Sequence, residues 1–139
     1  MNEATTDEFH IPAVPGSEKS ARVRAAAFAD ETGFGAERIE DIRTAVSEAV
    51  LNAIEHGLSG NASETVLIRF FRGSDGVRVT VSSKGRMFRF PADKPNIQEK
   101  IEGRSRPRGW GLYLIRELAD RVSVAEENGV TTISMEFLR

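Results

Sequence analysis

The sequence predicts an α/β fold of the α+β sandwich type, with helices on one face of a mostly antiparallel mixed sheet. Helical spacing of apolar residues marks residues 17–33, 36–56 and 110–120. Runs rich in β-branched and aromatic residues mark residues 65–83 and 121–138, and a turn signal divides each run into two strands. This order of segments is typical of helices packed against a sheet of hairpins.

Length and charge indicate one globular domain. The chain has 139 residues, of which 40% are hydrophobic and 29% are charged, and these are ordinary globular values. We expect a single domain over residues 8–139, preceded by a flexible segment at residues 1–7. The net charge of -2 argues against nucleic acid as the main partner, because neutralising a phosphate backbone needs clustered Lys and Arg.

The sequence also predicts a cytoplasmic location without membrane contact. No apolar run approaches the roughly 20 residues that cross a bilayer. The acidic start, MNEATTDEFH, lacks the basic and apolar blocks of a secretory signal. The absence of cysteine excludes disulfides and thiolate metal sites.

The first two elements are predicted from local signals. The stretch DEFHIPAV combines alternation with Pro12, so we expect an edge strand, since proline removes a donor from the ladder. The helix at residues 17–33 has Ser17 as a candidate cap and ends at Gly33. Its buried apolar face is expected to hold Val23, Ala26 and Ala27.

The helix at residues 36–56 has the clearest apolar pattern, and Gly57 suits a left-handed termination. Its predicted inner face consists of Ile39, Ile42, Val46, Ala49 and Ala53. The third helix places Leu112, Ile115 and Leu118 on one face. Between the last two helices, residues 91–109 contain three prolines and two glycines with little periodicity, which predicts a long mobile connection.

A polar stripe lies beside the apolar face of the second helix. Glu48, Asn52 and His56 follow at intervals of four residues, so their side chains can converge on one site. A carboxylate one turn from a carboxamide suits phosphoryl transfer, because an acceptor can orient a hydroxyl and an amide oxygen can help to hold Mg²⁺. A solvated helix face would show the same spacing, and an imidazole near a helix end often interacts with the last carbonyls.

A glycine pair precedes the third helix. Gly109 and Gly111 flank Trp110 where the first turn presents unpaired N–H groups, so a phosphate could bind there. Arg104, Arg106 and Arg108 could offset its charge. A simple loop-to-helix turn with solvated arginines is the alternative. The aromatic ring between the glycines is expected to pack against the sheet or lid, with stacking on a base as the less favoured alternative.

Together, EAVLNAIEHG at residues 48–57 and RGWGLYLIRELAD at residues 108–120 resemble the histidine-kinase-like ATPase superfamily. Within it, they resemble the small bacterial anti-sigma-factor serine kinases. The first stretch looks like the N box and the second like the second glycine box, and the order of elements over residues 8–138 fits the single-domain Bergerat fold of that family. The resemblance implies ATP and Mg²⁺ as cofactors, and a lid at about residues 91–108.

By position, the resemblance also implies roles for individual residues. Glu48 would be the catalytic acceptor, Asn52 would help to coordinate Mg²⁺, and Arg108 would lie close to the terminal phosphate. The backbone groups implied to contact the ATP phosphates belong to Gly109, Trp110, Gly111 and Leu112. The remaining candidate cofactor-binding positions are His56, Ser83 and Gly85.

One motif departs from the family pattern. Family members usually carry Asp-x-Gly at the end of the strand that here reads VRVTVSSKG, and the Asp accepts a hydrogen bond from the adenine amino group. Ser83 stands in place of the Asp, whereas Gly85 keeps the glycine. A neutral hydrogen bond is weaker than a charge-assisted one, so we expect adenine to bind about tenfold more weakly or worse. The sequence therefore leaves the selectivity for adenine open.

The leading functional hypothesis is an ATP-dependent protein serine kinase that also sequesters a sigma factor. By resemblance, its substrate would be an anti-anti-sigma protein of the STAS type, and the chain would form a homodimer. Because of Ser83, a second hypothesis is a partner-switching binding module with weak nucleotide use or none. A third is a small ATPase that hydrolyses nucleotide without a protein substrate.

Overall fold

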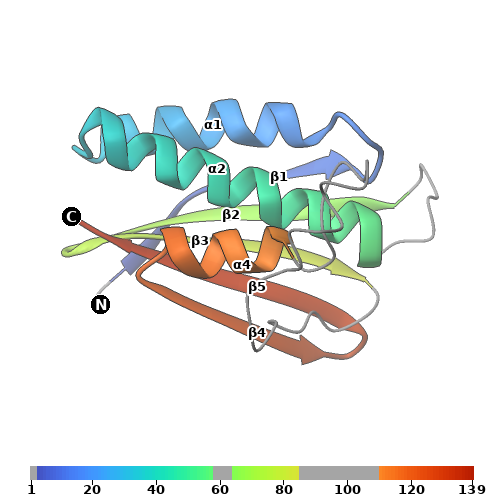
Figure 1. Ribbon diagram of the computed structural model, residues 1–139. Helices are drawn as coiled ribbons and strands as arrows, with labels where there is room; N and C mark the ends of the chain where they lie inside the picture. Colours follow the sequence, from blue (N-terminus) through green and yellow to red (C-terminus); the bar gives the residue numbers. More distant parts are fainter. Residues whose placement is uncertain (1–2, 58–63, 85–109) are drawn as a thin grey trace.

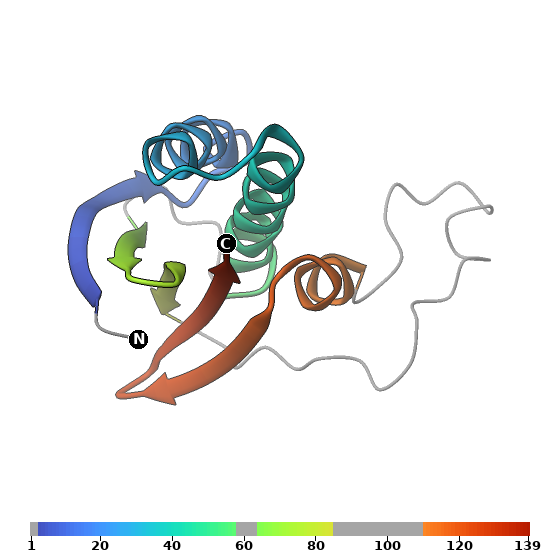
Figure 2. The ribbon, with the colours of Figure 1, turned by 90° about the vertical axis from the view of Figure 1, so that its left-hand side faces the viewer.

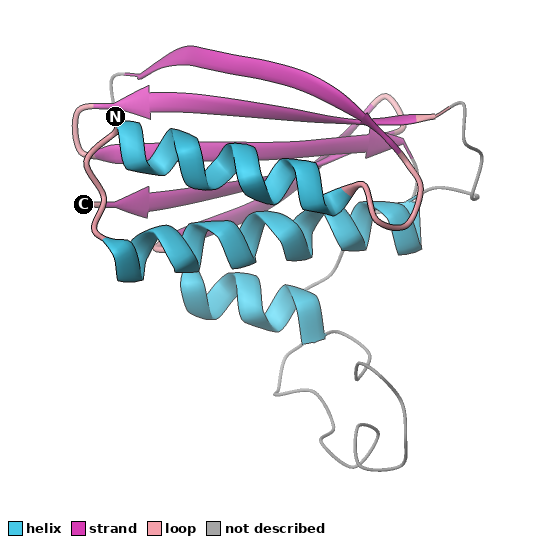
Figure 3. Cartoon of the chain, turned by 90° about the horizontal axis from the view of Figure 1, so that it is seen from above, coloured by secondary structure: helices cyan, strands magenta, loops and turns pink. Residues whose placement is uncertain are grey.

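The computed structural model describes residues 3–57, 64–84 and 110–139, and within them the chain forms one sheet covered by helices. The sheet has five strands in the order β1-β2-β3-β5-β4, and each neighbouring pair is antiparallel. The helices lie together on one face of the sheet (Figures 1 and 3). The elements are β1 (Glu3–Pro12), α1 (Glu18–Glu31), α2 (Ala36–Asn52), η1 (Ala53–Gly57), β2 (Thr65–Gly73), β3 (Gly76–Lys84), α4 (Trp110–Leu118), β4 (Arg121–Glu127) and β5 (Val130–Leu138).

This architecture confirms the predicted sandwich. The sheet curves around α2, which lies between α1 and α4 when the molecule is viewed end-on (Figure 2). The predicted mostly antiparallel mixed sheet is antiparallel in every pairing among the described strands. Both predicted hairpins are present, and Asn128 and Gly129 have φ values of 53° and 77°, as a two-residue turn between antiparallel strands requires.

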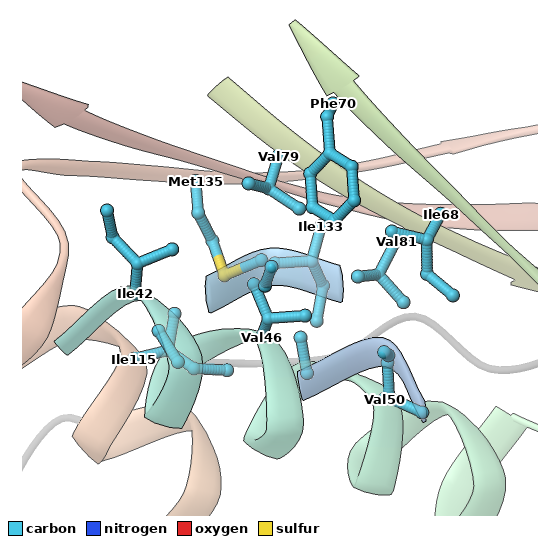
Figure 4. Packing of buried hydrophobic residues seen from close by; sticks show 14 of the residues in the cluster. Ile42, Val46, Val50, Ile68, Phe70, Val79, Val81, Ile115, Ile133 and Met135 are labelled. Atoms are coloured by element: carbon cyan, nitrogen blue, oxygen red, sulfur yellow. The ribbon is translucent and has the colours of Figure 1, made fainter. Parts of the chain in front are cut away.

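The core lies between the sheet and the helices. Alternate residues of the central strands point inward, so Val77, Val79 and Val81 of β3 are buried. Figure 4 shows Val46 and Val50 of α2 packed against this inner face. Each fully buried apolar side chain of this size contributes about 1.5–3 kcal/mol, so α2 is held mainly by apolar contact.

The predicted face of α2 is confirmed, but the helix ends differently from the expectation. Four of its predicted residues are fully buried and Ile39 is partly buried; the four are Ile42, Val46, Ala49 and Ala53. The α-helical part stops at Asn52, and the next turn, η1, is a π-helix. A π turn is rare and is frequently found at functional sites.

The strand β1 lies at the edge of the sheet, as Pro12 predicts, but begins earlier than expected. Residues 3–7 were expected to be flexible, yet Glu3 to Thr5 pair with β2, and a bulge follows between Thr5 and Asp7. The polar composition of this segment hid its strand character, because an edge strand can be polar on its open side.

The predicted inner face of α1 is wrong. Val23 is 68% exposed, whereas Ala21, Ala25, Phe28 and Ala29 are buried. Phe28 decides the orientation, because its ring stacks on Phe70 of β2 with 4.8 Å between centroids and is by far the largest apolar group on the helix. The helix ends at Glu31, and Gly33, with φ of +88°, follows the cap residue Thr32 near the predicted stop; the Ser17 side chain makes no capping hydrogen bond.

Candidate functional site

Three elements that carry predicted site residues meet at one end of the molecule, which we call the site end. There α2 and η1 finish, β3 finishes and α4 begins, on the right of Figure 1. α2 packs against α4, and η1 contacts β3. The chain thus brings together segments that are separated by up to about sixty positions in sequence.

One side of α2 faces α4. Arg38 fixes this orientation, because its Nη1 donates a 2.6 Å hydrogen bond to the carbonyl oxygen of Leu118, the last residue of α4. Glu48 and Asn52 lie within about 80° of Arg38 around the helix axis. Glu48 and Asn52 therefore lie toward the α4 side of α2, where Glu48 is partly buried.

Asn52 is the last residue of the α-helical part of α2 and is only 5% exposed. Its Nδ2 is buried and has no hydrogen-bond partner in the described part of the chain. An unmet polar group of this kind costs about 1–3 kcal/mol. A half-turn of the amide exchanges its nitrogen for its oxygen, so the same position could present a donor to phosphate or an oxygen to a cation.

Ser83 lies near the end of β3 and points to the same inner face as Val77, Val79 and Val81. It is 4% exposed, and its Oγ has no hydrogen-bond partner among the described residues. Thr131 of β5 stands directly opposite Ser83 in the antiparallel register and is fully buried. Two hydroxyl-bearing residues thus end an otherwise apolar inner face.

Sequence reasoning missed Thr131. The signal was present, because Ile133, Met135 and Phe137 are buried and alternate along β5. Extending that alternation by one step places Thr131 on the inner face. A polar residue in register with a buried apolar row is therefore the pattern that would have identified it.

α4 begins at Trp110, so its first turn opens at the site end. Gly111 is buried and Leu112 is 6% exposed, with its side chain in the hydrophobic core. The first-turn N–H groups of a helix carry partial positive charge and suit an anion. Any contribution of Leu112 to a ligand would thus come from its backbone.

The remaining predicted residues lie in η1 or outside the described residues. His56 lies in η1, beyond the α-helical part of α2 that carries Glu48 and Asn52. Gly85, Arg108, Gly109 and the expected lid at about 91–108 lie outside the described residues.

Other candidate features lie away from the site end or are absent from the described residues. A hollow of about 340 Å³ is lined by Arg121, Val122, Ser123, Ser134 and Glu136 of β4 and β5, and it contains no predicted site residue. Residues 3–57, 64–84 and 110–139 contain no group of three or more His, Cys, Asp or Glu that could hold a metal ion. Within the same residues, no helix is long and apolar enough to span a membrane.

Comparison with known proteins places this chain in a family. The model of the histidine kinase-like ATPase domain matches residues 11–137, which is nearly the whole chain. The chain therefore belongs to the histidine kinase-like ATPase domain family. This result confirms the family resemblance read from the N box and the glycine box.

Two relatives are similar along most of their length. A protein of Bacillus pumilus is 34% identical over 151 aligned residues, which cover 99% of this chain and 90% of the relative. A protein of Oceanobacillus iheyensis is 31% identical over 135 residues, which cover 94% and 85%. Both relatives are named serine-protein kinase RsbW.

Two solved structures share the fold. The RsbU and RsbW domains of a Mycobacterium tuberculosis protein superpose with a TM-score of 0.65 at 21% identity, over 96% of this chain and 32% of that longer chain. A chain of the SiaB–SiaC complex from Pseudomonas aeruginosa superposes with a TM-score of 0.63 at 13% identity, over 97% and 91%. At these identities the likeness supports the fold alone.

Proposed function

We propose that this chain is an ATP-dependent protein serine kinase of the anti-sigma-factor type. It phosphorylates a serine of an anti-anti-sigma partner of the STAS type and sequesters a sigma factor, and it acts in the cytoplasm. Membership of the histidine kinase-like ATPase family supports ATP use. The name of its relatives, serine-protein kinase, supports the reaction.

The observation that carries the proposal is the meeting of α2, β3 and α4 at the site end. In the proposed site, the triphosphate lies at the amino end of α4, where backbone N–H groups of the Gly111 turn offset its negative charge. Gly109 and Arg108 would complete this phosphate contact. Asn52 lies at the same end, and its amide, whose Nδ2 has no hydrogen-bond partner among the described residues, would contact the nucleotide or its cation.

In the proposed reaction, Glu48 acts as the proton acceptor. The serine oxygen of the partner attacks the γ-phosphorus, the bond from that phosphorus to the β–γ bridging oxygen breaks, and ADP leaves. Glu48 takes the serine proton, and Arg108 supports charge on the transferred group. Asn52 would help to hold Mg²⁺, which supplies charge neutralisation on the phosphates when bound.

The test is a phosphoryl-transfer assay with Mg-ATP and a STAS-type partner. Removing a general base costs about 10²–10⁴-fold in rate, so Glu48→Gln should reduce transfer by at least 100-fold and leave ATP bound. Glu37→Gln is the matched control, since Glu37 is an exposed carboxylate at the opposite end of α2. Transfer by Glu48→Gln at the wild-type rate would reject the proposed acceptor.

Ser83 favours one alternative, a partner-binding module that uses nucleotide weakly. Calorimetric titration separates the two functions, because the kinase requires heat of binding from Mg-ATP. No heat at millimolar Mg-ATP, together with retained binding of the partner, would replace the kinase with the binding module. Phosphate release without a partner would instead indicate a simple ATPase.

A further inference from the structure

The hydroxyl of Ser83 is a buried polar group of β3 without a hydrogen-bond partner among the residues that the structure describes. Its Oγ has no partner in the described part of the chain, although the residue is 4% exposed. Buried polar groups are nearly always hydrogen-bonded in folded proteins. A bound molecule or water can therefore supply the hydrogen-bond partner that the described residues do not.

The surroundings of Ser83 suit a flat ring more than a charged group. Val81 precedes it on the same inner face, and Figure 4 shows Val81 beside Ile133 of β5 and Val50 of α2. All three apolar side chains are at most 1% exposed and belong to the closed core, so Ser83 lies at the end of an uncharged, apolar region. Phosphates need charge or helix N–H groups, which the amino end of α4 offers, whereas an aromatic base needs an apolar wall and a few polar contacts.

The chemistry of a hydroxyl decides which bases fit. A serine hydroxyl can donate or accept a hydrogen bond, while an ionised carboxylate can only accept. The 6-amino group of adenine donates, whereas the 6-oxo group of hypoxanthine or guanine accepts. A carboxylate at residue 83 would satisfy only the amino group, but Ser83 can satisfy either by rotating its proton.

We infer that Ser83 makes the nucleotide site accept 6-oxo purine triphosphates about as well as ATP. This inference rests on the proposed function, since it assumes that a purine nucleotide binds at the site end. Thr131 adds a second buried hydroxyl-bearing residue opposite Ser83, so the neighbouring strand also contributes no fixed charge. The selectivity of the site is thus set by a group with no preferred hydrogen-bond direction.

The experiment compares ATP with ITP by calorimetry, in the presence of Mg²⁺. ITP carries the 6-oxo group without the 2-amino group of guanine, so it changes this position with the fewest other differences. For the wild-type chain, the dissociation constants of ATP and ITP should differ by less than tenfold. Ser83→Asp should raise the preference for ATP by at least tenfold, because a carboxylate repels the 6-oxo oxygen.

Ser83→Asn is the matched control. Its amide has the shape of Asp but can donate as well as accept, so the ratio for this variant should stay within tenfold. Circular dichroism checks the fold of both variants. If Ser83→Asp fails to fold, the wild-type ratio and the Asn variant still decide the inference.

The outcomes separate the inference from the function on which it rests. A wild-type preference for ATP above tenfold, or a ratio that a folded Ser83→Asp leaves unchanged, would overturn the inference and leave the kinase proposal standing. Failure of both nucleotides to bind would overturn the two together. Similar binding of ATP and ITP, with the preference restored by Asp alone, supports the inference.

Discussion

The two ends of α2 differ in how their polar groups are satisfied. At the amino end, the guanidinium of Arg38 bonds the carbonyl oxygen of Leu118, Asp41 at 3.1 Å, and Asp120. Asp120 in turn accepts a 2.7 Å hydrogen bond from the Leu138 N–H. At the site end, Asn52 Nδ2 and Ser83 Oγ are buried without partners among the described residues.

This difference indicates that one end of α2 contributes to stability and the other end to ligand binding. The end opposite the site end is completed by the protein itself, and Arg139 reinforces it by donating to the carbonyl oxygens of Thr32 and Ser74. At the site end, Asn52 Nδ2 and Ser83 Oγ lack hydrogen-bond partners among the described residues, and a ligand can supply them. Changes at the opposite end should therefore lower stability without altering nucleotide binding, whereas changes at the site end should weaken nucleotide binding without lowering stability.

Gly76 should give the largest effect on stability. A Cβ at this residue would lie 2.0 Å from the carbonyl oxygen of Phe137, so the strands would have to separate. Gly76→Ala should lower the free energy of unfolding by about 3 kcal/mol in urea denaturation. Gly35→Ala is the control, because nothing lies within 4 Å of its added Cβ. Equal stability of the two variants would refute the close contact.

Arg38 should give the next largest effect. Arg38→Met keeps the aliphatic stem but removes three polar contacts, so we expect a loss of about 1–2 kcal/mol in the free energy of unfolding. The dissociation constant for Mg-ATP should change less than about twofold. Arg43→Met removes an exposed pair with Glu40 and a buried Nε that has no partner among the described residues, so it should cost less than about 0.5 kcal/mol. A large loss of nucleotide affinity in Arg38→Met would show that the two ends of α2 do not have separate roles.

Asn52→Leu should have a smaller effect on stability, and in the opposite direction. Leucine has a similar volume and removes the unmet amide, so the nucleotide-free protein should gain about 1 kcal/mol. Binding of Mg-ATP should weaken by at least about tenfold, because the amide contact is lost. Thermal melting with and without Mg-ATP measures both quantities. A variant that is destabilised but binds normally would show that Asn52 has only a structural role.

Val23 should give the smallest effect, because it lies on the exposed side of α1. Val23→Ser should change the free energy of unfolding by less than about 0.5 kcal/mol. Ala25→Ser, on the buried side of the same helix, should cost about 1–3 kcal/mol, since it buries a hydroxyl. Chemical denaturation of the two variants checks the orientation of α1, and a larger loss from Val23→Ser would reverse it.

The sequence predicted the elements better than their contacts. The face of α2 was predictable because large apolar residues recur on one side of the helix only. The face of α1 was not, since alanines lie on several sides and the stacking of Phe28 on Phe70 is a long-range contact. The pairing of Arg38 with Asp120 joins residues 82 positions apart, so no local sequence pattern predicts it.

The candidate site was predictable only in part for similar reasons. Glu48 and Asn52 follow from helical spacing, and Ser83 follows from the resemblance, because it stands where the family carries the Asp of Asp-x-Gly. The inward position of Thr131 follows from the alternation along β5, but its place opposite Ser83 depends on the register between β3 and β5 in the folded sheet. The π turn of η1 left no recognisable signal, because its sequence continues the helical pattern.

The bulge in β1 also bears on how copies of this chain can associate. An edge strand presents unpaired backbone N–H and C=O groups with which another chain can pair, and bulges, prolines and charges prevent such pairing. β1 has the bulge beside Asp7 together with Pro12, and the other border of the sheet, β4, carries exposed charges at Arg121 and Glu127. Growth of the sheet from one copy into the next is thus disfavoured at both borders, so the expected homodimer needs a different surface.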